Sequence, residues 1–133
     1  MEYLYHGSTT QGIKLLEPRK RFTPAGAIDY SAIYASSSPA FAICHSFPWS
    51  SDEGIDIEIK DGRMQLLVPS QLRDRLNTPI SLYKILSVGF ERTQEEETGY
   101  TWHTTASVPV IEEARYESVF EALEKNGGKV SYV

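Results

Sequence analysis

The sequence has little cysteine, a shortage of positive charge and no long apolar run, and each shortage narrows the class of protein. Its 133 residues include a single cysteine, Cys44, so no disulfide can form within the chain and a cytoplasmic location is expected. No apolar run approaches the roughly 20 residues of a membrane-spanning helix, and the start lacks the pattern of a secretion signal. The formal net charge of −5 argues against broad nucleic-acid binding, which needs a basic stripe.

The proportions of the chain favour one folded domain. Hydrophobic residues make up 41% and charged residues 23% of the sequence, which is ordinary for a globular protein and does not indicate disorder. A chain of 133 residues can bury a core without metals or disulfides. The sequence contains no internal repeat, low-complexity tract or linker-like change in composition. We therefore expect a single domain over residues 1–133.

Short apolar and β-branched segments dominate the predicted elements. Strands are predicted over residues 2–6, 32–35, 55–60, 64–68, 80–86, 100–105, 108–114 and 129–133. Helices are predicted over about 38–47 and 117–125, with a helical turn or two over 69–76. Glycines and prolines punctuate residues 7–31, which are predicted to be mostly irregular. The pattern predicts an α+β fold with mixed, mostly antiparallel sheets and a few short helices.

The first candidate site residue is a histidine at the end of a predicted strand. In Tyr3-Leu4-Tyr5-His6-Gly7-Ser8-Thr9, the strand delivers one imidazole and is followed at once by a glycine, which lets backbone approach a ligand closely. Hydroxyl groups follow at Ser8, Thr9 and Thr10. A histidine that is hydrogen-bonded within a strand-end turn explains the same residues without a ligand.

The second candidate is a tyrosine near the end of another predicted strand. Ala32-Ile33-Tyr34-Ala35-Ser36 precedes Ser38-Pro39, which has the residues of a helix N-cap and first helical position. Tyrosine in a strand usually packs against its neighbours. At a strand end, however, its ring can stack on a flat heteroaromatic ligand.

The two segments together, LYHGS and then IYASSSPAFA, resemble the ADP-ribosyltransferase superfamily. The likeness is to its small bacterial branch, which includes the rifampin-modifying transferases and the poly-ADP-ribose polymerase-like catalytic domains. The resemblance implies an ADP-ribosyltransferase-like fold and NAD as co-substrate. The superfamily's first motif, a strand-borne histidine followed by glycine, matches His6 and Gly7, and its second, a strand-borne tyrosine, matches Tyr34.

The resemblance also implies roles for these residues. His6 would hydrogen-bond a ribose hydroxyl of NAD, the backbone of Gly7 would hold the nicotinamide carboxamide, and Tyr34 would stack on the nicotinamide ring. Ser8 and Ser36 would complete the cofactor site. Loss of nicotinamide leaves an oxocarbenium-like centre, which a nearby carboxylate would stabilise.

The third part of the superfamily's pattern is a carboxylate. The superfamily usually carries an acid on a later strand, but residues 100–110, where that strand is expected, contain none. The nearest carboxylates are Glu95, Glu96 and Glu97 upstream, and Glu112 and Glu113 downstream. We select Glu97 as the predicted acid. If none of them reaches the site, NAD hydrolysis, another ligand or binding alone becomes the better interpretation.

Other clusters favour plainer interpretations. Adjacent residues on a helix point about 100 degrees apart, so Cys44-His45 predicts a buried cysteine beside a surface or pocket histidine rather than a thiol nucleophile with its base. His6, His45 and His103 lack the spacing of metal ligands, and no metal is expected. Trp49 is predicted to anchor a solvent-facing loop, with a pocket wall as the alternative. The basic cluster Arg19–Arg21 is predicted to be a solvated loop.

Three functions therefore stay open. The first is an NAD-dependent ADP-ribosyltransferase that cleaves the nicotinamide–ribose bond and passes ADP-ribose to water or an unidentified acceptor. That acceptor would be a small molecule or a protein, with nucleic acid the least favoured and no membrane partner. The second is a non-catalytic nucleotide-binding or protein-interaction module on the same fold. The third, RNA 2'-phosphotransferase-like chemistry, asks for more basic residues than Arg19–Arg21 supply.

Overall fold

The computed structural model describes residues 2–23, 26–93 and 100–133, the side chains at 20–30 excepted. Its central sheet has β1 (Tyr3–Ser8) in the interior, between β7 and β4. Six of its seven strands run in the order β11-β7-β1-β4-β9-β8, the seventh, β3, pairs with the long strand β4 off this path, and every pairing is antiparallel. The bounds of the other strands are Arg19–Thr23 (β3), Gly26–Ser36 (β4), Ile80–Leu86 (β7), Glu91–Arg92 (β8), Thr101–Thr104 (β9) and Glu112–Tyr116 (β11).

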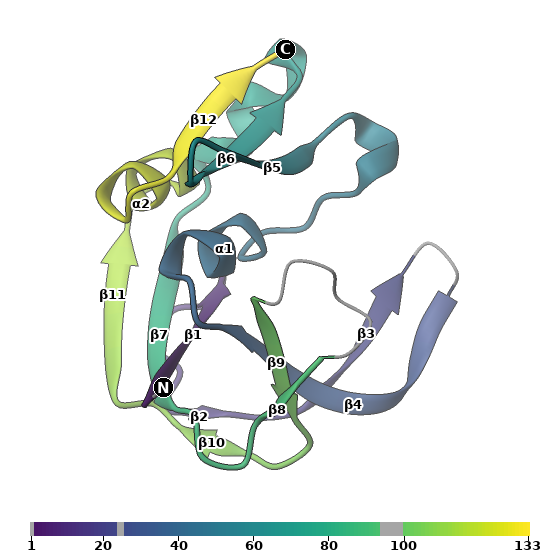
Figure 1. Cartoon of the computed structure of the whole chain (residues 1–133), viewed down its shortest axis with the longest axis vertical. Helices are drawn as coiled ribbons and strands as arrows, with labels where there is room; N and C mark the ends of the chain where they lie inside the picture. Colours follow the sequence, from purple (N-terminus) through teal and green to yellow (C-terminus); the bar gives the residue numbers. More distant parts are fainter. Residues whose placement is uncertain (1, 24–25, 94–99) are drawn as a thin grey trace.

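A second, three-stranded sheet lies at the other end of the molecule (Figure 1). It consists of β5 (Asp56–Lys60), β6 (Arg63–Val68) and β12 (Lys129–Tyr132), with β5 antiparallel and β12 parallel to β6. The β5–β6 turn uses Asp61 and Gly62, both at positive φ (53° and 76°), as a two-residue hairpin of this twist requires.

Two short α-helices lie between the two sheets (Figure 1). The helix α1 (Pro39–Cys44) begins where Ser38 Oγ accepts the Phe41 N–H, and α2 (Val119–Lys125) begins where Ser118 Oγ accepts the Glu121 N–H. A 3-10 segment, η1 (Ser51–Glu53), follows α1, and another, η2 (Ser70–Asn77), follows β6. The helices thus bury apolar faces against both sheets at once.

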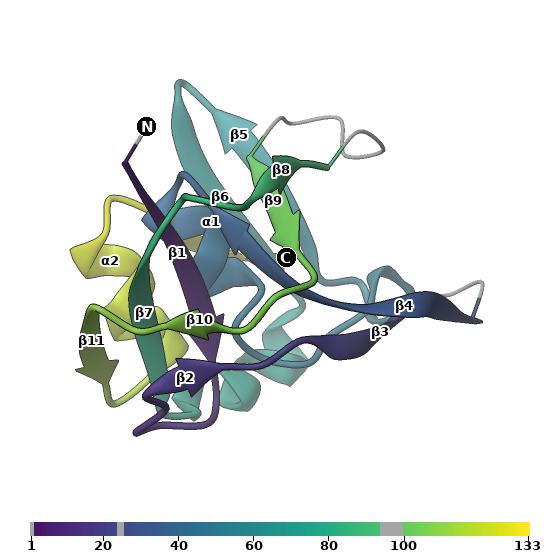
Figure 2. The ribbon, with the colours of Figure 1, turned by 90° about the horizontal axis from the view of Figure 1, so that it is seen from below.

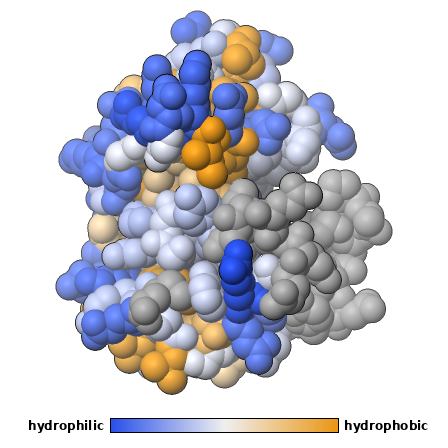
Figure 3. Space-filling view, in the orientation of Figure 1, coloured by the Kyte–Doolittle hydropathy of each residue, from blue (hydrophilic) through white to orange (hydrophobic). Residues whose placement is uncertain are grey.

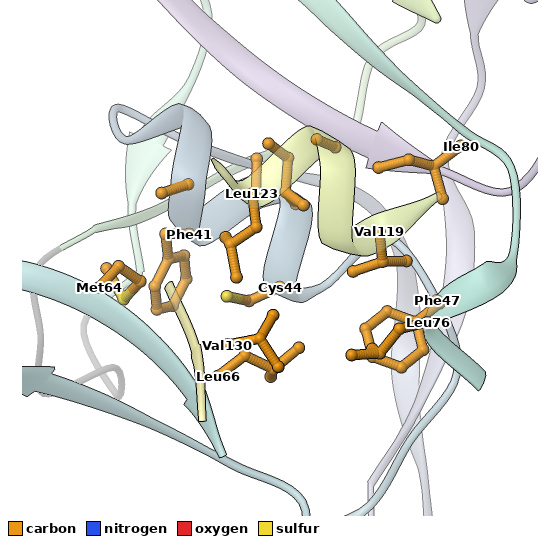
Figure 4. Close-up of a cluster of buried hydrophobic side chains, with 14 of the residues drawn as sticks. Phe41, Cys44, Phe47, Met64, Leu66, Leu76, Ile80, Val119, Leu123 and Val130 are labelled. Carbon is orange, nitrogen blue, oxygen red and sulfur yellow. The ribbon is translucent and has the colours of Figure 1, made fainter. Parts of the chain in front are cut away.

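The larger core fills this space (Figure 4). Cys44 of α1, Leu123 of α2 and Leu66 of β6 are each 0% exposed and point toward one another. A smaller core lies on the opposite face of the central sheet around Leu4 and Tyr83, where the β2–β10 pair (Leu15–Leu16 and Val108–Pro109) crosses it (Figure 2). Because β1 has a core on each side, its backbone is held in place by packing from both faces.

The predicted class is confirmed: the chain forms one α+β domain with mostly antiparallel sheets and few short helices. Most strands and both helices lie where they were predicted, although α1 ends at Cys44 rather than near Phe47. The prediction that residues 7–31 are mostly irregular was wrong. They form β2, β3 and the first part of β4, because Pro18 and Gly26 stand at strand boundaries instead of interrupting strands. The basic cluster Arg19–Arg21 accordingly lies in β3, not in a loop.

Helix α1 packs so closely on β1 that it leaves no room for a side chain at Gly7. A Cβ atom placed there would lie 2.5 Å from the Ala42 carbonyl oxygen and 2.7 Å from Ser46 Cβ. The sequence suggested that this glycine lets a ligand approach the backbone. In the structure, the close approach of α1 is what requires a glycine here. Backbone, rather than a flexible side chain, makes the closest contact, so the clash cannot be relieved by a rotamer change.

We expect Gly7→Ala to lower the free energy of unfolding by about 1–3 kcal/mol, because α1 must shift away from β1. Urea unfolding followed by tryptophan fluorescence measures the loss. Thr9→Ala, an exposed change two residues along, is the control and is expected to stay within about 0.5 kcal/mol of the parent. Equal stability of Gly7→Ala and the parent would contradict the packing described for α1.

Candidate functional site

The candidate site lies where β1 and β4 part. Among the described residues the two strands share one register pair, Tyr5 with Ser36. Beyond it, β1 continues from His6 to Ser8 against β7, and β4 continues against β9. A regular ladder would next pair His6 with Ala35 and then Gly7 with Tyr34. Instead the His6 side chain bridges the gap, with its Nδ1 2.6 Å from the Tyr34 carbonyl oxygen.

A cavity of about 200 Å³ opens at this point. Strands β1 and β4 supply most of its wall, α1 and the residue after it close one side, and β9 contributes a single threonine. The lining residues are Tyr5, His6, Gly7, Tyr34, Ala35, Ser36, Phe41, Ala42, His45 and Thr101. The predicted residues His6, Gly7, Tyr34 and Ser36 are thus brought together.

Burial and a backbone bond define the state of His6. Burial lowers the pKa of its imidazole, the bond to the Tyr34 carbonyl raises that pKa to a smaller extent, and the Arg19 guanidinium lowers it further. The ring is therefore neutral at pH 7. A carbonyl oxygen can only accept, so Nδ1 carries the proton and donates it to Tyr34, which leaves Nε2 as an acceptor for a ligand hydroxyl.

Both predicted serines accept hydrogen bonds from nearby backbone N–H groups. Ser36 Oγ accepts the Ser38 N–H at 3.0 Å and so shapes the turn that starts α1, although the residue also lines the cavity. Ser8 is not among the lining residues; its Oγ accepts the Thr10 N–H at 3.0 Å. A role for Ser8 in holding a cofactor stays a prediction.

The structure adds aromatic side chains that the sequence interpretation did not assign to the site. The rings of Phe41 and His45 lie 4.6 Å apart, centroid to centroid, and both line the cavity. His45 also stacks on Trp49 at 5.9 Å. Phe41 and His45 are four residues apart, a spacing that places helical side chains on one face. This spacing was the signal in the sequence that could have assigned both rings to the site.

Cys44 and Trp49 are placed largely as predicted. The Cys44 thiol lies in the core, and burial raises its pKa to about 12, so it is a neutral packing group and no nucleophile for His45. Trp49 anchors its loop by donating its Nε1–H to the Cys44 carbonyl at 2.7 Å. It also lines a second, open hollow with Phe47, Pro48, Glu53, Arg75 and Thr78, in which Glu53 and Arg75 form an ion pair.

The position of the acid differs from the superfamily pattern as far as the described residues reach. Strand β9 lies beside β4 and presents Thr101, not a carboxylate, to the cavity. Glu97 lies outside the described residues and stays a prediction. Of the residues on either side of that stretch, Thr93 contacts His103, which does not line the cavity (Thr93 Oγ1 to His103 Nδ1, 2.9 Å), and the Tyr100 ring lies 5.7 Å from that of Phe41, which does.

Glu113, one of the downstream candidates, does not line the cavity and serves the fold instead. It lies on β11, two strands from β1, where its carboxylate accepts Ser81 Oγ–H at 2.6 Å, the Gly12 N–H at 2.9 Å and Arg115 Nε–H at 3.1 Å. Burial alone would raise the pKa of Glu113, but these hydrogen bonds outweigh it and lower the pKa to about 2. The other candidate, Glu112, is exposed.

Glu113 and Tyr83 together hold the segment that leaves β1. The fully buried Tyr83 pairs with His6 on one side and with Glu113 on the other. Its hydroxyl donates to the Thr10 carbonyl at 2.5 Å and accepts the Ile13 N–H at 3.2 Å. The end of the histidine-bearing strand is therefore fixed from outside the cavity.

The surface gives no sign of one dominant contact area on the face seen in Figure 3. That face is largely hydrophilic, with separate apolar areas. Among residues 2–23, 26–93 and 100–133, no helix has the length and apolar character needed to cross a membrane. Nor do the described residues gather three or more histidine, cysteine, aspartate or glutamate side chains into a metal-binding group.

Comparison with known proteins leaves the fold and the geometry as the basis for function. The chain matches no protein-family model, no curated protein and no solved structure.

The depressed pKa of Glu113 predicts a specific pH dependence of stability. Its folded-state pKa of about 2 lies below the ordinary 4.5, so its contribution is present above about pH 4.5 and is lost as the pH falls toward 2. Glu113→Gln is expected to lower the free energy of unfolding by about 1–3 kcal/mol at pH 7, with the difference from the parent shrinking as the pH falls.

Urea unfolding at several pH values between neutral and acid measures that difference. Glu112→Gln, the same change at the exposed neighbour on β11, is the control and should stay close to the parent throughout. A Glu113→Gln difference that does not depend on pH would refute the role given to its charge.

Proposed function

We propose that this chain is an NAD-binding protein of the ADP-ribosyltransferase type, with the nicotinamide–ribose end of NAD in the cavity between β1 and β4. One observation carries the proposal. His6 and Tyr34, the two residues on which the sequence resemblance rests, meet at the parting of their strands and line the same cavity. A histidine placed only for packing would not need an open space beside it.

The chemistry of the lining suits that ligand. Nε2 of neutral His6 can accept a hydrogen bond from a ribose hydroxyl, and the rings of Tyr34, Phe41 and His45 offer faces to a flat heteroaromatic ring. The cavity of about 200 Å³ is small for a whole dinucleotide, since sites for drug-sized ligands span about 300–1,000 Å³. Under this proposal the ADP half of NAD lies outside it.

Transfer would proceed by departure of nicotinamide from C1' of the ribose. The bond between C1' and the pyridinium nitrogen breaks, nicotinamide leaves with the electron pair, and an acceptor or water attacks C1' and releases a proton. A carboxylate near C1' would stabilise the developing positive charge far better than a hydroxyl group does. Turnover therefore depends on Glu97, the acid predicted from sequence.

A second candidate, a binding module without turnover, is favoured by one observation. The described lining contains no carboxylate, and β9 contributes Thr101 to it, where the superfamily usually has an acid. A site of this kind would retain NAD or a related nucleotide without activating C1'.

The first test removes the imidazole at the parting of the strands. His6→Ala is expected to weaken NAD binding by about tenfold or more, because the ribose hydroxyl loses its acceptor. Any release of nicotinamide should fall by at least about 100-fold, because the ribose is no longer positioned. Calorimetry and chromatographic detection of nicotinamide give the two values.

The control is His103→Ala, which removes an imidazole that does not line the cavity. It should weaken binding less than His6→Ala does. If the parent protein neither binds NAD nor releases nicotinamide, the proposed function is wrong.

The second test separates the transferase from the binding module. Glu97→Gln should abolish nicotinamide release while leaving NAD bound if Glu97 is the acid. Glu112→Gln, on the exposed part of β11, is the matched control and should leave release intact. If the parent binds NAD but releases no nicotinamide with or without acceptors, the binding module is the correct function.

A further inference from the structure

We propose that Arg19 binds the phosphate group on the 5' carbon of the nicotinamide ribose. The site then recognises a nicotinamide nucleotide rather than its nucleoside, and the ADP half of NAD leaves the cavity on the side of β3. This inference rests on the proposed function, because it extends the same site. Arg19 belongs to β3 and is not part of the cavity lining, so it holds the part of the ligand that lies beyond the cavity.

The strand register places Arg19 on the face of the sheet that carries the cavity. Arg19 pairs with Ala32 of β4, and Tyr34, which lines the cavity, lies two residues further along that strand. Side chains alternate between faces along a strand, and directly opposed residues share a face. Ile33 packs in the smaller core on the opposite face, as this alternation requires. Arg19 is therefore a diagonal neighbour of Tyr34, within reach of a long side chain, on two strands that run side by side (Figures 1 and 2).

The charge of Arg19 acts on the histidine of the cavity. Burial is the main cause of the lowered pKa of His6, and the Arg19 guanidinium lowers that pKa further. Since interactions between exposed charges are screened over about 10 Å, the guanidinium lies close to the imidazole. Under the proposed function, His6 accepts a hydrogen bond from a ribose hydroxyl. The guanidinium is therefore also close to the groups attached to that ribose.

The guanidinium of Arg19 lacks a counter-charge in the described part of the protein. Arg19 is exposed, and it forms no ion pair with any carboxylate whose side chain the structure describes. By contrast, Arg75 is paired with Glu53, and Arg115 with Glu113. The described lining of the cavity offers no carboxylate either. A ligand in the cavity is thus the available source of an anion for Arg19.

The 5'-phosphate is the anionic group that lies nearest to the ribose in a nicotinamide nucleotide. One methylene group and one oxygen atom separate it from the ribose ring. A planar guanidinium can donate two parallel hydrogen bonds to phosphate oxygens, and such charge-assisted bonds are stronger than neutral ones. The same guanidinium disfavours a pyridinium ring that arrives without a phosphate, because two positive charges then lie near each other. Both effects favour the nucleotide over the nucleoside.

The experiment compares three probes that share the pyridinium ring and its ribose: nicotinamide riboside, nicotinamide mononucleotide and NAD. Calorimetric titration of the parent protein should give a Kd for the mononucleotide at least about tenfold below that for the riboside, because the riboside lacks the phosphate. Arg19→Gln should weaken binding of the mononucleotide and of NAD by at least about tenfold. Its affinity for the riboside should stay the same or rise, because a repulsive charge has been removed.

Two further variants are the controls. Arg92→Gln makes the same change at another exposed arginine, which pairs with Trp102 on the face that carries the smaller core. It should change the three affinities by less than about twofold. Arg19→Lys keeps the charge but loses the planar fork, so it should retain part of the preference for the mononucleotide over the riboside.

A second measurement uses the parent protein alone and therefore does not depend on the folding of Arg19→Gln. An attraction between an exposed guanidinium and a phosphate is screened by salt. Raising the salt concentration from about 0.05 M to about 0.5 M should weaken binding of the mononucleotide by at least about twofold. Binding of the riboside should not weaken, because the guanidinium repels its positively charged ring.

The outcomes separate the two proposals. If none of the three probes binds the parent protein, the proposed function fails. If the probes bind but the riboside binds as tightly as the mononucleotide, the role of Arg19 is overturned while the proposed function stands. The same conclusion follows if Arg19→Gln weakens all three probes equally, if Arg92→Gln has the same effect as Arg19→Gln, or if salt leaves binding of the mononucleotide unchanged.

Discussion

The site depends on one hydrogen bond, from His6 Nδ1 to the carbonyl oxygen of Tyr34. In a continuous ladder, a backbone N–H of β1 would approach this carbonyl. Here the His6 side chain takes that place, so the two strands part without leaving the Tyr34 carbonyl unpaired. The same bond fixes which nitrogen of His6 carries the proton. The opening of the sheet and the chemistry of its histidine thus have a common cause.

The parting of β1 from β4 is tolerated because β1 is secured elsewhere. All six of its residues pair with β7, and the segment that follows is tied to Tyr83 and Glu113. The helix α1 presses on the other face at Gly7. Residues far from the cavity therefore fix the positions of its walls. The residues that line it are then available to bind a ligand.

Much of the fold could be predicted from local patterns, because alternation, caps and turn residues are read over a few positions. The strands within residues 15–31 could not, since they depend on pairing with partners whose register the sequence does not state. His6, Gly7, Tyr34 and Ser36 were found through motifs, whereas Thr101 became visible only through the register of β9 with β4. The four-residue spacing of Phe41 and His45 was present in the sequence. The sequence interpretation nevertheless treated His45 only as the neighbour of a buried cysteine.

The pairing of β1 with β7 also bears on how the protein is made. Tyr3 lies opposite Leu86, and the cavity needs residues from Tyr5 to Thr101. Strand β4 can meet β1 early at Tyr5 and Ser36, but β7, which pairs with every residue of β1, follows only at Ile80–Leu86. Such non-local pairing slows folding and leaves apolar strand edges open in the meantime. The histidine-bearing strand thus lacks its main partner until β7 has been made, and it is open to mispairing and to chaperones during that time.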